Sequence, residues 1–132
     1  GDPVRARAWL LPVWEAMVAG TAGRSLSDQQ KLVQVLEQSL EDASSADARR
    51  WLARVEAAQQ SRPNDAYLQY LAGMVYLHHR LWGKSQGLLS QAVRGLPDAV
   101  LQRRAWSALA QLAEQRQDHE AALHAWKQAA RL

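Results

Sequence analysis

The sequence of 132 residues contains no cysteine. This absence excludes a disulfide, a zinc site built on thiolates and a thiol nucleophile. Long hydrophobic runs are also missing: although 48% of the residues are hydrophobic, they are interleaved with Gln, Arg and Glu, and no run approaches the roughly 18 apolar residues that a membrane-spanning helix needs. We therefore expect this segment to be soluble and free of sulfur chemistry.

Phenylalanine is absent too, and β-branched residues occur singly, whereas Ala, Leu, Gln, Arg and Glu dominate. This composition favours helices and gives no reason to expect a strand. The length fits one compact domain. The sequence therefore predicts a single all-α domain.

The charged residues lack a block of one sign. Sixteen Lys and Arg and thirteen Asp and Glu give a formal net charge of +3 and a pI near 9.7, and they are mixed along the chain. The pairs Arg49-Arg50 and Arg103-Arg104 fall in first turns of expected helices, where a solvated face explains them. Because a surface that binds phosphates usually needs clustered cations, we expect no nucleic-acid partner.

Apolar spacing and helix-breaking residues predict about seven helices. Pro12 must open or kink the first of them, Ser27 begins a capping box with Gln30, and Pro63 stops the third. Asn64 or Asp65 can cap the fourth helix, and Asp98 and Asp118 can cap the sixth and the seventh. The expected ranges are about 4–18, 27–42, 46–60, 66–79, 83–94, 99–116 and 119–132.

Two helix pairs repeat at a constant offset of 37 residues. Small and large residues recur at matched places, namely Gly73, Tyr76, Ser85, Leu89 and Ala92 in one pair and Ala110, Ala113, Ala122, Trp126 and Ala129 in the next. An earlier pair precedes the first of these by 34 residues, so that Val55, Ala58 and Pro63 match Leu89, Ala92 and Pro97. We assign the three extra residues to a one-turn extension around residues 98–102.

The unit from Trp106 to Ala129 resembles the tetratricopeptide repeat. This resemblance implies antiparallel helix pairs in a right-handed superhelix. It divides the single domain into an N-terminal capping helix at residues 1–24, a degenerate helix pair at 27–63, and two repeats at 66–97 and 103–132. Of the tryptophans, Trp51, Trp106 and Trp126 are expected in the core, whereas Trp9 and Trp14 could face a partner.

In tetratricopeptide domains the first helices of the pairs line a concave groove for a partner. By resemblance the residues of this row, which we call the groove row, are Tyr67, Tyr70, Met74, Leu77, His78, Arg104, Ser107, Gln111 and Glu114. The lysine and asparagine set that clamps C-terminal carboxylates is absent, and an aromatic and apolar groove fits a hydrophobic helix or an extended peptide better. No Ser, His and Asp spacing suggests a catalytic triad. We therefore expect a protein-binding scaffold and no enzyme.

A more specific resemblance begins at Leu81-Trp82-Gly83-Lys84-Ser85 and continues to Ala92. This stretch is similar to a segment of the C-terminal tetratricopeptide region of the HemY family, proteobacterial inner-membrane proteins linked to haem and porphyrin metabolism. Residues 11–14, 71–73 and 125–130 resemble the same region. The resemblance implies membrane-spanning segments that precede this chain, a location on the cytoplasmic side of the inner membrane, and partners among haem-pathway enzymes.

Two features imitate ligand sites. Gly83-Lys84-Ser85 is similar to the end of a phosphate-binding loop, but His78 stands where that loop needs glycine. His78 and His79 point about 100° apart on a helix and cannot converge on one metal ion. We expect no metal or cofactor, with His78 alone as a candidate axial haem ligand. Direct binding of haem or a porphyrin, and a structural arm for homo-oligomerisation, stay open as alternatives.

Overall fold

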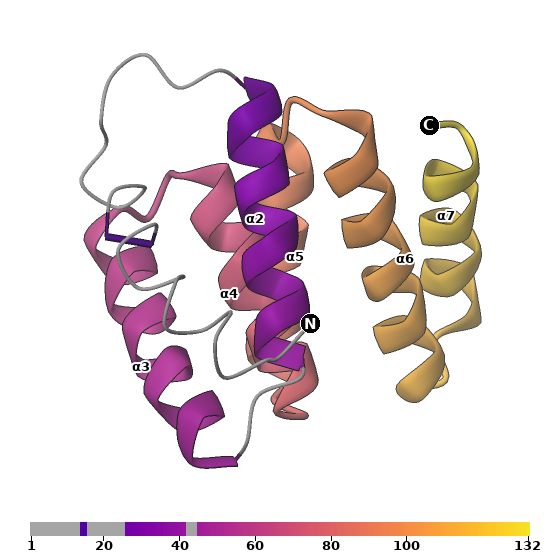
Figure 1. Cartoon of the computed structure of the whole chain (residues 1–132). Helices are drawn as coiled ribbons and strands as arrows, with labels where there is room; N and C mark the ends of the chain where they lie inside the picture. Colours follow the sequence, from indigo (N-terminus) through magenta and orange to yellow (C-terminus); the bar gives the residue numbers. More distant parts are fainter. Residues whose placement is uncertain (1–13, 16–25, 42–44) are drawn as a thin grey trace.

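The computed structural model describes residues 14–15, 26–41 and 45–132. Six helices and no strand occupy this described part of the chain (Figure 1). They are α2 Leu26–Glu41, α3 Ser45–Ser61, α4 Ala66–His78, α5 Trp82–Gly95, α6 Ala99–Gln115 and α7 His119–Ala130. The predicted all-α fold is confirmed. The expected first helix and N-terminal cap lie outside the described residues, apart from the helical Trp14 and Glu15.

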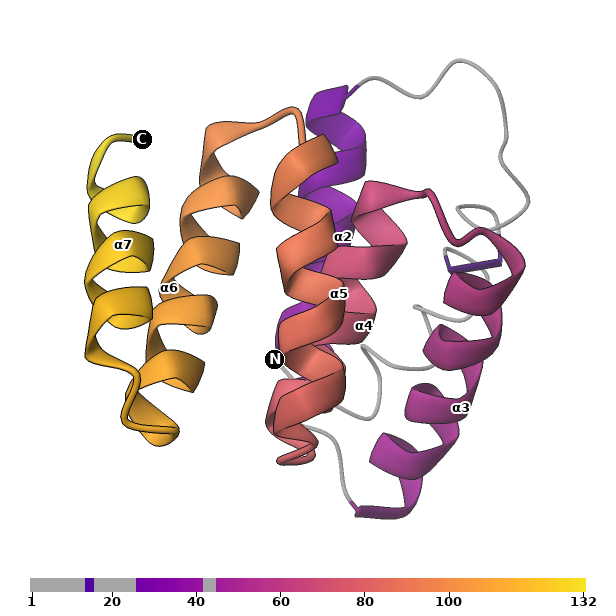
Figure 2. The ribbon, with the colours of Figure 1, turned by 180° about the vertical axis from the view of Figure 1, so that it is seen from behind.

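Consecutive helices run in opposite directions and pack in adjacent pairs. Helices α2, α4 and α6 run one way, and α3, α5 and α7 run the other (Figures 1 and 2). The closest packing joins α4 with α5 and α6 with α7, and α5 packs in turn against α6. Helix α4 is the centre of the molecule, because it contacts α2, α3, α5 and α6.

The two helix pairs that repeat at an offset of 37 residues in the sequence are related by the same offset in the structure. Helices α5 and α7 begin at Trp82 and His119, and α4 and α6 end at His78 and Gln115. Each of these pairs is 37 residues apart. Helix α6 begins at Ala99, four residues before the position that corresponds to the start of α4. The predicted one-turn extension is therefore confirmed at the N-terminal end of α6.

The turns inside the two helix pairs have the same backbone geometry. Arg80 and Gln117, again 37 residues apart, both adopt a left-handed conformation with φ of 61°. In both turns the next amide donates to a carbonyl five residues earlier, Leu81 to Tyr76 at 2.8 Å and Asp118 to Ala113 at 2.9 Å. This is the hydrogen bond that closes a helix in the Schellman motif. Both pairs therefore reverse direction in the same way.

Aspartates begin three of the helices: Asp98 and Asp118 do so as predicted, and of the two candidates for α4 the cap is Asp65 and not Asn64. The Asp65 carboxylate accepts hydrogen bonds from the Tyr67 and Leu68 amides at 3.0 and 3.2 Å. Asp98 and Asp118 cap α6 and α7 through single amides. These bonds satisfy amides that have no partner within the helix. Helix α5 differs, because its first residues receive no side-chain cap.

Gly73 allows α4 and α5 to approach closely. A Cβ atom at this position would lie 2.7 Å from the Cγ atom of Leu89, whose side chain is fully buried. Ser85 crosses the same contact, since its hydroxyl donates to the Gly73 carbonyl at 2.8 Å. The small residue that the repeat pattern required at position 73 is thus explained by helix packing.

The tryptophans only partly follow the prediction. Trp51 is buried as expected, and Trp14 is buried against it, with ring centroids 5.9 Å apart, and so does not face a partner. Trp106 is half-buried. The prediction for Trp126 was wrong: this side chain is 39% exposed, because no helix of the described structure covers the outer side of α7. Trp9 lies outside the described residues.

No helix formed by the described residues is both long and apolar enough to cross a membrane.

Candidate functional site

A cluster of three side chains joins the helices that run in the same direction. Tyr70 of α4 donates a hydrogen bond to the carboxylate of Glu37 on α2 at 2.6 Å. Arg104 of α6 donates through Nε to the Tyr70 hydroxyl at 3.1 Å and through a terminal nitrogen to Glu37 at 2.6 Å. Tyr70 and Glu37 are buried, whereas the Arg104 side chain is 46% exposed. We call these residues the three-helix cluster.

The electrostatics of this cluster are those of a paired, structural group. Burial raises the pKa of Tyr70 far above its usual value, and the nearby Glu37 carboxylate raises it further. The hydrogen bond with Glu37 likewise raises the pKa of Arg104. At neutral pH the cluster therefore holds a neutral phenol and a guanidinium, and a buried carboxylate is stable only when paired in this way. The cluster fixes α2, α4 and α6 to one another.

Four residues of the groove row are engaged in contacts within the protein. Tyr70 and Arg104 belong to the three-helix cluster, and the fully buried Tyr70 presents no surface to a partner. The Ser107 hydroxyl donates to the carbonyl of Arg103 at 2.8 Å, one helical turn earlier. Glu114 accepts a hydrogen bond from the indole of Trp126 at 2.7 Å. These contacts indicate that much of the row holds the fold together.

The other five residues of the groove row divide by exposure. Tyr67, Met74 and Leu77 are half-buried against the core, whereas His78 and Gln111 are exposed. None of the nine lines either of the two hollows described below. The row as a partner-binding surface therefore stays a prediction.

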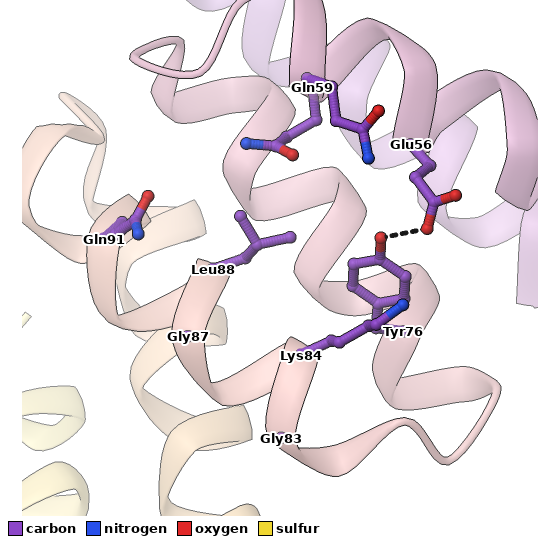
Figure 3. Close-up of a pocket in the computed structure, with 9 residues that line it drawn as sticks. Glu56, Gln59, Tyr76, Gly83, Lys84, Gly87, Leu88 and Gln91 are labelled. Atoms are coloured by element: carbon purple, nitrogen blue, oxygen red, sulfur yellow. Dashed lines mark hydrogen bonds between the residues drawn. The ribbon is translucent and has the colours of Figure 1, made fainter.

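A hollow of about 400 Å³ opens between α3, α4 and α5 (Figure 3). Its walls are mainly the exposed sides of α3 and α5, and Tyr76 of α4 lies between them. We call it the α3–α5 hollow. Its lining residues are Glu56, Gln59, Gln60, Tyr76, Gly83, Lys84, Gly87, Leu88 and Gln91.

Amide side chains supply much of the hydrogen-bonding capacity of this hollow. Gln59 and Gln60 make no side-chain hydrogen bond within the part of the chain that the structure describes. Gln91 uses its oxygen to accept one from Gln69 at 3.3 Å and keeps its two N–H donors. A glutamine amide can both donate and accept. Both walls of the hollow thus carry amide groups that can donate and accept hydrogen bonds.

Two glycines leave the backbone of α5 bare in the hollow. A Cβ atom at Gly83 or Gly87 would meet nothing within 4 Å. No packing within the described structure therefore requires glycine at either position, in contrast to Gly73. Glycine in a helix interior costs about 1 kcal/mol relative to alanine. These glycines allow another molecule to approach the helix backbone closely.

Contacts around Tyr76 fix one end of the hollow. The Tyr76 hydroxyl donates to the Glu56 carboxylate at 2.5 Å, which joins α4 to α3. The ammonium group of Lys84 lies 5.5 Å from the centre of the Tyr76 ring, and the two side chains lie side by side in Figure 3. Lys84 therefore belongs to the wall of the hollow, and a cation above an aromatic face is stabilised there.

The three tyrosines of the chain are expected to resist ionisation. Burial raises the pKa of Tyr67, Tyr70 and Tyr76, and for Tyr76 burial and the hydrogen bond to Glu56 raise it to about 12. Absorbance at 295 nm should therefore show little phenolate at pH 10, where unfolded tyrosine is half ionised. Half-ionised tyrosines at pH 10 in the folded protein would contradict these environments.

The same difference makes stability depend on pH. Because the folded pKa of Tyr76 is raised above the unfolded value near 10, its contribution is fully present below pH 10 and falls as pH rises towards 12. The Tyr76→Phe variant should therefore lack the part of the decrease in stability above pH 10 that comes from ionisation of Tyr76. Urea unfolding of both proteins at several pH values measures it.

A smaller hollow of about 250 Å³ lies between α5 and α6. Trp82, which is 40% exposed, lines it together with Gln86 and with Leu112 of α6. Trp82 therefore lies at the junction of α5 and α6.

The histidines form no metal site in the described residues. His78 is exposed, and the rings of His78 and His79 are nearly perpendicular, with centroids 6.0 Å apart. No group of three or more potential ligands is placed to hold a metal ion in this part of the chain. Nothing in the geometry distinguishes His78 as a haem ligand.

Comparison of the chain with protein-family models, with curated proteins and with solved structures finds no match.

Proposed function

We propose that this chain is a helix-repeat scaffold that binds a polypeptide segment of a partner protein in the α3–α5 hollow. The observation that carries the proposal is the lining of that hollow. It combines amide side chains that the fold does not use with a bare stretch of helix backbone at Gly83 and Gly87.

The chemistry of the hollow matches an extended polypeptide. A peptide backbone presents alternating N–H donors and C=O acceptors, and glutamine amides on both walls can pair with either. The glycines leave room for main chain against main chain, and the half-buried Leu88 offers an apolar contact. Since Glu56 is occupied by Tyr76, Lys84 is the charged side chain that can bind an acidic group or carbonyl of the segment.

The arrangement of the helices supports the same class of function. Two pairs related by 37 residues, with matched turns and small residues at their contacts, fit a tetratricopeptide-type repeat. The hydrogen bond between Tyr76 and Glu56 joins α4 to α3 at the hollow itself, so that a bound segment would meet a wall that is already formed. The exposed His78 and Gln111 of the groove row form the alternative binding surface.

We place this scaffold in a HemY-like inner-membrane protein, on its cytoplasmic side, with a haem-pathway enzyme as partner. The support is the sequence of residues 81–92 and 125–130. Fractionation of the intact protein checks the setting: it should sediment with inner membranes and resist extraction by salt. Release by salt would contradict an integral membrane anchor.

Filling the hollow should abolish binding without loss of stability. Peptides selected from a displayed random library on the immobilised chain provide the ligand. Gly87→Leu places a side chain in the hollow and suits a helix better than glycine. We expect the affinity of a selected peptide to fall by more than about tenfold, that is by about 1.4 kcal/mol or more. Fluorescence anisotropy of a labelled peptide measures it.

Gln111→Leu is the matched control, because it adds a leucine to an exposed helix position on the groove row. It should leave the affinity unchanged. If Gln111→Leu removed binding and Gly87→Leu did not, the groove row would be the binding surface and the α3–α5 hollow would not. Circular dichroism melting should show both variants folded.

A further inference from the structure

The outer face of α7 carries a stripe of four exposed side chains, three of them apolar, that nothing covers in the described structure. His119, Leu123, Trp126 and Ala130 follow one another at spacings of four, three and four residues, and all four are exposed. Leu123 is 56% exposed. This spacing is typical of a two-helix coiled coil, in which residues alternately three and four positions apart face the partner helix. We call these four residues the α7 seam.

The corresponding stripe of the preceding pair is a helix–helix interface. Subtracting 37 from the seam gives Trp82, Gln86, Leu89 and Val93 on α5. The first two lie at the junction with α6, whereas Leu89 packs against Gly73 of α4. Trp82 and Gln86 meet Leu112 of α6 around the smaller hollow. At the other end, Gln102 of α6 donates to the Val93 carbonyl at 2.6 Å. The His119 and Leu123 end of the α7 seam therefore corresponds to a face that receives a helix in the preceding pair.

The side chain of Trp126 is ordered although it is partly exposed. Its indole N–H donates a hydrogen bond to the Glu114 carboxylate of α6 at 2.7 Å, and 39% of the side chain stays exposed. A large aromatic side chain that is already ordered loses little conformational freedom when it is buried by a partner.

The charges beside the seam specify the partner and its direction. Glu120 and Lys127 are exposed and seven residues apart, each one position after a seam residue. When two such helices pair antiparallel, equivalent flanking positions face each other. Glu120 of one copy then lies near Lys127 of a second copy, and this happens twice across the two-fold axis. Leu123 packs against the second copy's Trp126 in the same arrangement.

We propose that a second copy of this chain covers the α7 seam, in a two-fold dimer whose α7 helices pair antiparallel. A two-fold interface uses the same patch on both subunits, and the α7 seam is self-complementary in this sense. This surface is separate from the α3–α5 hollow, so that a dimer presents two hollows.

Sedimentation velocity of the chain from about 1 µM to about 1 mM tests the proposal. The chain should shift from monomer to dimer as its concentration rises, and Leu123→Glu should stay monomeric throughout. Glu120→Lys and Lys127→Glu should each weaken dimerisation about tenfold, because like charges replace opposite charges at both contacts. The double variant should dimerise like the wild type, since the pairs are restored with their signs exchanged.

Mixing the two single variants gives the sharpest result. One copy then carries two lysines and the other two glutamates, so the mixture should dimerise more strongly than either variant alone. A wild-type chain that is monomeric up to the highest concentration, a dimer unaffected by Leu123→Glu, or a double variant without recovery would each overturn the proposal. Because the substituted side chains are exposed, circular dichroism should show all variants folded.

Discussion

Leu89→Ala should lower the free energy of unfolding by about 2–5 kcal/mol, the usual cost of removing a fully buried leucine side chain. Leu89 has no exposed surface and fills the space against Gly73, where α4 and α5 are closest. The neighbouring backbone cannot collapse readily into the cavity, since Ser85 bonds the Gly73 carbonyl across the same contact. Urea denaturation followed by circular dichroism measures the loss.

Leu88→Ala is the matched control one residue earlier. Leu88 is half-buried at the edge of the α3–α5 hollow, where water can replace the lost atoms. The expected loss is below about 1.5 kcal/mol, because a partly exposed side chain transfers less apolar area from water. Equal losses for the two leucines would show that α5 does not present residue 89 to the core.

Arg104→Ala should destabilise the protein by about 2–3 kcal/mol. The substitution leaves the buried Glu37 carboxylate without its cation, and an uncompensated buried charge costs more than a lost neutral hydrogen bond. Exposure of Arg104 keeps the effect below that of a fully buried pair. Unfolding by urea at pH 7 gives the value.

A variant without any polar group in the cluster should recover most of this loss. Glu37→Leu, Tyr70→Phe and Arg104→Leu together leave no unpaired buried atom at this place. Replacing a whole buried ion pair by apolar residues is often neutral or stabilising. We expect stability within about 1 kcal/mol of the wild type. If Arg104→Ala had no effect and the triple variant unfolded, the three-helix cluster would not hold α2, α4 and α6 together.

The sequence predicted those features that depend on neighbouring residues or on the repeat. Helix ranges followed from apolar spacing, and Asp65, Asp98 and Asp118 identified helix starts because capping is a local interaction. The offset of 37 residues predicted where α6 would be extended. It also predicted a small residue at position 73, which the contact with Leu89 explains.

Features that depend on the placement of distant helices were not predicted. Tyr70 has the spacing of a groove residue, and no pattern within α4 shows that α2 contributes Glu37, 33 residues earlier, to bury it. The left-handed turns at Arg80 and Gln117 gave no signal either, because neither residue is glycine. Turn residues of other types adopt this conformation when the hydrogen bonds around them require it.

The α3–α5 hollow left only a faint trace in the sequence. Gly83 and Gly87, one helical turn apart, were visible, but their neighbours Lys84 and Ser85 suggested a comparison with phosphate-binding loops. That glycine is unnecessary for packing at both places follows only from the empty space around them. Two glycines four residues apart inside an expected helix are the signal that could have indicated a surface for close approach.

Mapping of backbone amide shifts on the isotope-labelled chain, during titration with a selected peptide, tests the scaffold most directly. Glycine amides give signals in a separate region of the spectrum, so Gly83 and Gly87 can be followed individually. We predict that the largest changes fall on residues 56–60 of α3 and 83–91 of α5, around the α3–α5 hollow. Changes confined to α4 and α6 at His78 and Gln111, or to the α7 seam, would contradict it.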